Sequence, residues 1–188
     1  MAPMSRELFE FEDPDRFLIG TIGAPGEREF YLQVKGESKG RKILASFALE
    51  KSQAAALAER IREMVRQFGL AFSSNEPDLA PLETPVEAEF TLGVMALSWS
   101  ADERKFLFEA QEMAQGEGGE IIEALILEDE AGAPALLRVK ISLEEIGTFA
   151  KRTELVVAAG RQPCVFCGGP INPNGHLCPR ANGYRRQG

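Results

Sequence analysis

Apolar and polar residues alternate in three segments near the start of the chain, residues 16–23, 28–35 and 42–49. The segments are rich in aromatic and β-branched residues, and short turn-forming stretches that contain glycine connect them. Because successive side chains of a strand point to opposite faces, this alternation predicts strands with one buried face. We therefore expect an antiparallel meander, preceded by a shorter alternating segment at 7–11.

The period changes from two to about 3.6 after residue 50, which predicts an amphipathic helix over 51–68. Gly69 is expected to end this helix, and the helix is expected to cover the preceding sheet. Its apolar stripe consists of Leu57, Ile61, Met64, Val65 and Phe68.

Residues 70–86 contain three prolines among polar residues, as in a linker or a long surface loop. Strands are then predicted at 87–98, 105–111, 120–128 and 136–141.

A second amphipathic helix is predicted over 143–159. Ser142 and Glu145 have the spacing of a capping box at its start, and Gly160 follows its end. Its apolar stripe consists of Ile146, Phe149, Ala150, Thr153 and Val157.

The pattern as a whole predicts an α+β fold with two mostly antiparallel meander-plus-helix lobes, 1–69 and 87–160, on either side of the 70–86 segment. The two passages from strand to helix align, with Ile43 to Glu50 matching Leu137 to Glu144. Any strand that leads into an amphipathic helix has this appearance, so a pseudo-repeat and a chance likeness both stay open.

The charge of the chain is unevenly distributed. The 188 residues carry a net charge of −8, but the segment from 161 onward has four arginines and no acid, which leaves −12 for the first 160 residues. An acidic body repels phosphate backbones, so nucleic-acid binding is disfavoured except through the tail. No apolar run approaches the ~20 residues of a membrane helix, and the start lacks a signal-like apolar region, so we expect a cytoplasmic protein.

All three cysteines and the one histidine of the chain lie between 164 and 178, as Cys164, Cys167, His176 and Cys178. A C-x-x-C turn lets two thiolates reach one ion, and Gly168-Gly169 permits the backbone angles of such a turn. Proline, asparagine and glycine between the two pairs allow the chain to fold back. We therefore predict a Cys3His zinc knuckle within a C-terminal module, residues 161–188. Four protein ligands leave no position for water, so the zinc is expected to be structural.

Other chemistries of the C-x-x-C pair fit less well. A redox pair does not need a His-x-Cys partner, and a haem attachment needs histidine where Gly168 stands. An iron–sulfur cluster usually takes four cysteines, and a disulfide would leave one of three cysteines over.

No catalytic signature accompanies the predicted metal site. The single histidine is assigned to the metal, so no imidazole is left for a Ser–His or Cys–His mechanism, and no P-loop or dinucleotide-binding turn occurs. Arg180, Arg185 and Arg186, beside Tyr184, are candidates for contact with an anion or a partner.

Several motifs together resemble a bacterial family of uncharacterised proteins, a domain of unknown function that spans essentially the whole chain. They are Arg16-Phe17 with Gly20-Thr21 and Gly23, Phe90-x-Leu92-Gly93 with Trp99, and the ending from Ala159-Gly160-Arg161 through Cys164-x-x-Cys167-Gly168 and His176-x-Cys178-Pro179-Arg180 to Tyr184. Val165 stands where the family usually has proline. The resemblance implies a pathway shared with a histidine-phosphatase-family protein and a protein similar to phosphatidylinositol-type lipid kinases. It implies no catalytic residue.

The leading hypothesis is a non-enzymatic protein whose structural zinc knuckle presents a basic tail to another protein. One alternative is an enzyme or enzyme subunit that acts on a phosphorylated small molecule gripped by the tail arginines. The other is weak nucleic-acid binding through the same tail.

Overall fold

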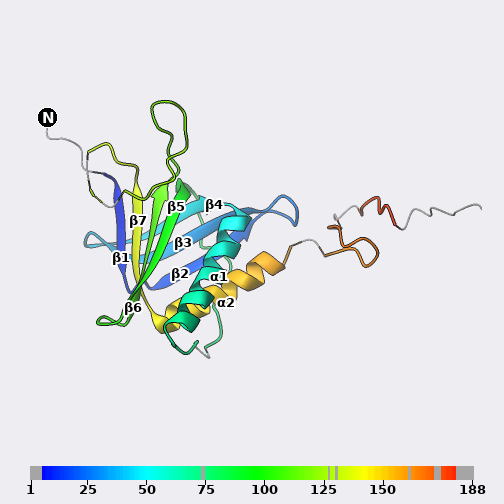
Figure 1. Ribbon diagram of the computed structural model, residues 1–188, viewed down its shortest axis with the longest axis horizontal. Coiled ribbons are helices and arrows are strands. Elements are labelled where there is room, and N and C mark those ends of the chain that lie inside the picture. Colours follow the sequence, from blue (N-terminus) through cyan, green and yellow to red (C-terminus); the bar gives the residue numbers. More distant parts are fainter. Residues whose placement is uncertain are drawn as a thin grey trace, which may run out of the picture.

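The computed structural model describes residues 6–72, 75–126, 128–129, 131–160, 162–171 and 175–180. Its fold is α+β, with one seven-stranded sheet in the order β1-β7-β6-β5-β4-β3-β2 and two helices that pack on it (Figure 1). The elements are β1 (Leu8–Glu12), β2 (Arg16–Ile22), β3 (Glu29–Ser38), β4 (Arg41–Leu49), α1 (Lys51–Gln67), β5 (Ala88–Ser100), β6 (Lys105–Glu112), β7 (Leu136–Ser142) and α2 (Leu143–Ala158). Among the described residues, no helix is long and apolar enough to cross a membrane.

Two antiparallel meanders, β2-β3-β4 and β5-β6-β7, form most of the sheet, as the alternation predicts. Two parallel pairs complete it, because β4 pairs with β5 and β1 pairs with β7. The strands that precede residues 70–86 and those that follow them therefore belong to one continuous sheet, and side chains from both groups share one hydrophobic core.

The sheet is strongly curved and wraps around α2. This helix contacts β2 as well as β6 and β7, although β2 and β7 are far apart in the strand order. The rings of Phe17 in β2 and Phe149 in α2 stack with centroids 4.4 Å apart. The edge strand β1, at the opposite end of the strand order from β2, approaches β3. The Glu10 N–H of β1 donates to Ser38 Oγ of β3 at 3.3 Å.

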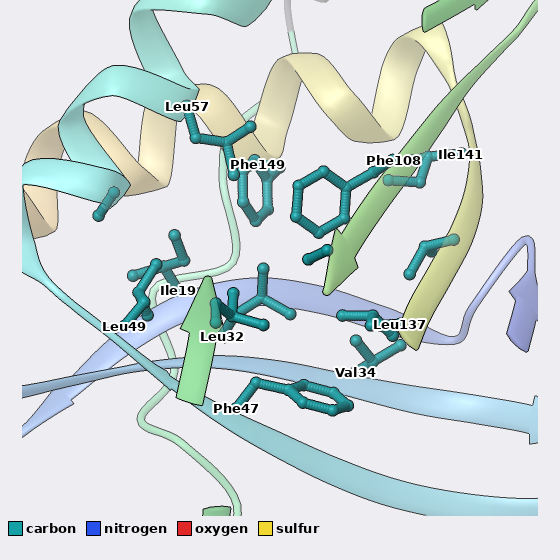
Figure 2. Close-up of a cluster of buried hydrophobic side chains, with 14 of the residues drawn as sticks. Ile19, Leu32, Val34, Phe47, Leu49, Leu57, Phe108, Leu137, Ile141 and Phe149 are labelled. Atoms are coloured by element: carbon teal, nitrogen blue, oxygen red, sulfur yellow. The ribbon is translucent and has the colours of Figure 1, made fainter. Parts of the chain in front are cut away.

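The hydrophobic core fills the space between the helices and the curved sheet. Figure 2 shows Leu57 of α1 and Phe149 of α2 on the helix side, with Ile19, Leu32 and Leu137 on strands of the sheet. All five of these side chains are almost fully buried. Burial of such side chains from both helices stabilises their position on the sheet.

Both helices begin with a capping box and bury most of the predicted stripe. Ser142 Oγ accepts from the Glu145 N–H at 3.2 Å, which confirms the predicted cap of α2. In α1, four of the five stripe residues are buried, but Phe68 is 47% exposed. The prediction for Phe68 is wrong because α1 ends at Gln67, and Phe68 is its C-cap, where the helical face no longer sets the side-chain direction.

The strand predicted at 120–128 is absent from its described part, which has only an isolated bridge between Ile121 and Gln115. Side chains instead form hydrogen bonds with the backbone of this segment. The Ile126 N–H donates to Gln111 Oε1 at 2.9 Å, and Arg6 Nη1 donates to the Ile126 carbonyl at 2.7 Å. Because β7 already pairs with this side of β6, no free strand edge remains there for the segment.

Residues 75–86, which we call the strap, contact α2 near their start and then β2 and β3. The Gln33 side chain bonds both backbone groups of Glu83, at 2.9 and 3.0 Å. Leu82 is 9% exposed and sits over Gly20, where a Cβ atom would lie only 2.6 Å from it. The strap is therefore anchored to the sheet by a buried leucine and by hydrogen bonds.

Candidate metal centre

A small hairpin follows α2 and holds the first cysteine pair. The Cys164 N–H donates to the Gly169 carbonyl at 2.7 Å, and the Ile171 N–H donates to the Gln162 carbonyl at 2.9 Å. Gly168 closes the turn at φ +73°, a conformation that residues with a Cβ atom rarely adopt. The tight turn brings Cys164 and Cys167 to one side, as the C-x-x-C spacing requires.

The structure brings the four predicted ligands together. One ligand atom from each of Cys164, Cys167, His176 and Cys178 lies within 4.8 Å of all the others. The Cys164 and Cys178 sulfurs are 3.8 Å apart, and Cys167 Sγ is 3.3 Å from His176 Nε2. A tetrahedral zinc ion with the usual bond lengths holds its sulfur and nitrogen ligands roughly 3.5–3.8 Å apart. The group could therefore hold a metal ion with little rearrangement.

The distances exclude a disulfide in this geometry. A disulfide needs sulfurs about 2.05 Å apart, whereas Cys164 and Cys178 are separated by almost twice that. All three cysteines are free thiols, and Cys164 and Cys178 are each only 6% exposed. A group of free thiols, two of them buried and Cys167 half-buried, beside an imidazole matches the chemistry of a closed metal site.

Backbone N–H groups favour the thiolate form at the first cysteine. The N–H groups of Cys167 and Phe166 point at the Cys164 sulfur and lower the pKa of that thiol. At Cys167 the Gly169 N–H acts in the same direction, but burial and the thiols of Cys178 and Cys164 outweigh it, so the pKa of Cys167 is raised. Cations relieve such repulsion between neighbouring sulfurs, because a metal binds both as thiolates.

The comparisons with known proteins place the chain in a family. A family model described as "Protein of unknown function (DUF3090)" matches residues 9–178. The chain belongs to the DUF3090 family. The match ends on the last ligand, Cys178, so it includes the sheet, both helices and all four cysteine and histidine positions. Neither the curated proteins nor the solved structures gave a match.

Of the three arginines predicted to contact an anion or a partner, the structure of the DUF3090 chain describes only Arg180. Arg180 Nη1 donates to the Phe166 carbonyl at 3.2 Å, which ties the segment after the last ligand to the first knuckle turn. Contact of Arg180 with an anion or a partner stays a prediction. Arg185 and Arg186 lie outside the described residues.

Three apolar residues between the candidate ligands are exposed, a feature that the sequence analysis did not identify. Val165 is 90% exposed, Phe166 60% and Leu177 86%. Their spacing was a usable signal, because backbone that wraps a metal directs the ligands inward and the residues between them outward. We call Val165, Phe166 and Leu177 the knuckle patch.

Three aspartates outside the metal centre are engaged in ion pairs. Asp13 lies 2.7 Å from Lys105 Nζ, and Asp15 lies 3.1 Å from Lys42 Nζ. Asp129 pairs with Arg6 at 3.6 Å. These acids anchor turns, and none of them forms a pair of carboxylates set up for acid–base chemistry.

Proposed function

We propose that this DUF3090 protein is a non-enzymatic, cytoplasmic protein whose C-terminal zinc knuckle docks onto another protein. Zinc is the ion that best suits three thiolates and one imidazole at near-tetrahedral spacing. Four protein ligands leave no place for a reactive water, so the ion's role is to hold the knuckle in shape. Because the only histidine of the chain belongs to this set, no imidazole is left for acid–base catalysis.

The knuckle patch is the observation that carries the proposal. Val165 and Leu177 are exposed more fully than any other large apolar side chain of the described residues, and Phe166 adds an aromatic ring. An exposed apolar group of this kind, held in place by a metal, resembles the centre of a protein–protein contact. Exposure of three such side chains to water is unfavourable, and a partner that covers them recovers this free energy.

The positive charge of the C-terminal segment favours a partner whose binding surface has an apolar centre and acidic residues around it. The segment from 161 onward carries four arginines and no acid, and Arg180 is fixed against Phe166, beside the knuckle patch. Basic groups at the rim of an interface increase the association rate with an acidic surface. The two pathway companions implied by the resemblance, a histidine-phosphatase-family protein and a lipid-kinase-like protein, are the first partners to test.

The test compares the knuckle patch with a matched apolar residue elsewhere. A photo-reactive phenylalanine at position 166, in the full chain and in the native cells, is expected to cross-link one partner. The same group at Leu79, which is 68% exposed on the strap, is the control and is expected to cross-link none. Equal cross-linking at both positions would argue against the proposal.

The purified partner then gives the affinity. We expect F166S to weaken binding by about tenfold or more, since hot-spot aromatic anchors typically contribute about 2 kcal/mol or more. L79S should bind like the natural chain. Metal content is measured in both variants, because a loss of metal from F166S would explain weaker binding without any role for the patch. An unchanged affinity in metal-loaded F166S contradicts the proposal.

A further inference from the structure

A cleft of about 620 Å³ lies where the sheet and helices meet the metal-binding hairpin. Its lining comes from distant parts of the chain, including the β2–β3 turn, the start of α1, the end of α2 and Pro170 of the hairpin. This volume falls within the range of sites that bind small molecules. No element of the proposed docking surface lies in it.

Two basic residues of the cleft, Arg28 and Lys51, form no ion pair with any described residue. Arg28 donates from Nη1 to the Ala159 carbonyl at 2.7 Å, but its Nε atom is buried and has no hydrogen-bond partner among the described residues. Lys51, the first residue of α1, is exposed. A buried donor without a partner is costly, and a bound acceptor would remove that cost.

The acidic residues of the same cleft are already engaged. Glu29 accepts from the Tyr31 hydroxyl at 3.1 Å. The Glu50 side chain caps α1 by accepting from the backbone N–H of its first turn. Neither carboxylate pairs with Arg28 or Lys51 among the described residues, so the two cations are available to an external anion.

Part of the remaining lining is apolar. Phe30 and Leu49 form part of the wall, and Val156 of α2 contributes another part. The cleft therefore places two basic groups, without an ion pair among the described residues, beside carbon surface, which suits an organic anion better than a bare inorganic ion.

We propose that this cleft binds a small organic anion, a molecule with a phosphate or carboxylate group on an apolar body. Arg28 and Lys51 bind the charged group, and Phe30, Leu49 and Val156 contact the apolar part. This site is separate from the knuckle patch, so either proposal can fail while the other stands.

Four defined probes test the charged and apolar contacts separately. Phenyl phosphate and benzoate carry an aromatic ring with each kind of anion, whereas inorganic phosphate and phenol each lack one half. Binding to the full chain is measured by protein NMR titration at low salt. We expect the better of the two ring-bearing anions to bind at least tenfold more tightly than inorganic phosphate and phenol. Failure of both ring-bearing anions to bind at millimolar concentration, or equally tight binding of inorganic phosphate or phenol, would overturn the proposal.

Charge-removing variants then locate the anion. R28Q and K51Q are each expected to weaken binding of the preferred probe by about tenfold, because charge-assisted hydrogen bonds are the stronger ones. K39Q, at an exposed lysine of the β3–β4 turn, should bind as the natural chain does. R28K keeps the charge and shows whether a defect in R28Q arises from folding. If K51Q and R28Q bind like K39Q, the assignment is wrong.

Discussion

At the scale of single residues, Cys178 provides the sharpest test of the metal centre. It is buried, and its sulfur lies 3.8 Å from that of Cys164. C178S removes one of four ligands, so we expect zinc affinity to fall by about 100-fold or more and the purified protein to lose its metal. Elemental analysis and competition with a chelating dye measure both quantities.

Leu177 offers the matched control for this substitution. It lies directly beside Cys178 in the chain but points into solvent, with 86% of its side chain exposed. L177S should therefore keep one zinc ion per chain. Retention of zinc by C178S, or an equal loss from L177S, would contradict the assignment of the ligands.

The four candidate ligands could be identified from the sequence because cysteine and histidine occur nowhere else in the chain. Their convergence needed no knowledge of long-range packing, since the hairpin that holds them is local. The knuckle patch was missed for the opposite reason. The ligand spacing indicates that the residues between the ligands point away from the metal, but their exposure also depends on what other parts of the chain cover.

At the scale of elements, the contribution of the strap to the free energy of unfolding should fall at acidic pH. Arg16 holds the pKa of Asp78 below its ordinary value of 3.8, chiefly through a hydrogen bond from its guanidinium at 2.6 Å. A carboxyl group with a lowered pKa in the folded state contributes stability above pH 3.8 and loses that contribution as the pH falls through the lowered value. Because the Asp78 side chain is 46% exposed, we expect the contribution to be below about 1 kcal/mol.

D78N isolates this contribution. The free energy of unfolding, measured in urea from pH 6 to pH 2.5, should be lower for D78N at the upper end, and the two curves should converge at the lower end. D15N is the comparison variant, because the ion pair of Asp15 with Lys42 joins two exposed side chains. A constant difference between natural chain and D78N across the range would show that Asp78 acts through something other than its charge.

Local patterns predicted the helices and the antiparallel strands well because short-range periodicity determines which face of an element is buried. They could not predict the parallel pairs of β1 with β7 and β4 with β5, since each joins strands far apart in the chain. The wrong prediction of a strand at 120–128 has the same cause, because strand pairing depends on distant parts of the chain. Its apolar residues suit a strand, but the available edge of β6 is taken by β7, and Gln111 bonds the backbone of the segment instead.

At the scale of the whole molecule, the sheet and helices should fold without the metal. The core cluster contains none of the metal-ligand candidates, and the hydrogen bonds described for the hairpin link residues 162–180 to one another. We expect chelation of zinc to change the unfolding free energy of the sheet by less than about 0.5 kcal/mol, as for independent sites. Amide signals of the hairpin should collapse under the same treatment.

Urea unfolding followed by far-UV circular dichroism measures the first effect, and NMR measures the second. A chain that ends after Gly160 lacks the site and should be insensitive to the chelator. A shift of more than about 1 kcal/mol in the full chain would show that the metal stabilises the sheet itself.

The parallel pair of β1 and β7 has a consequence for how the protein is made. Leu8 to Glu12 pair with Leu136 to Lys140, so the first strand to leave the ribosome binds beside the last strand of the sheet. Phe9 also packs on Phe47 of β4 and Phe90 of β5, but β1 has no strand partner among the described residues until β7 has been made. The nascent chain therefore carries an unpaired aromatic strand until β7 has been translated, and it would be a target for chaperones during that interval.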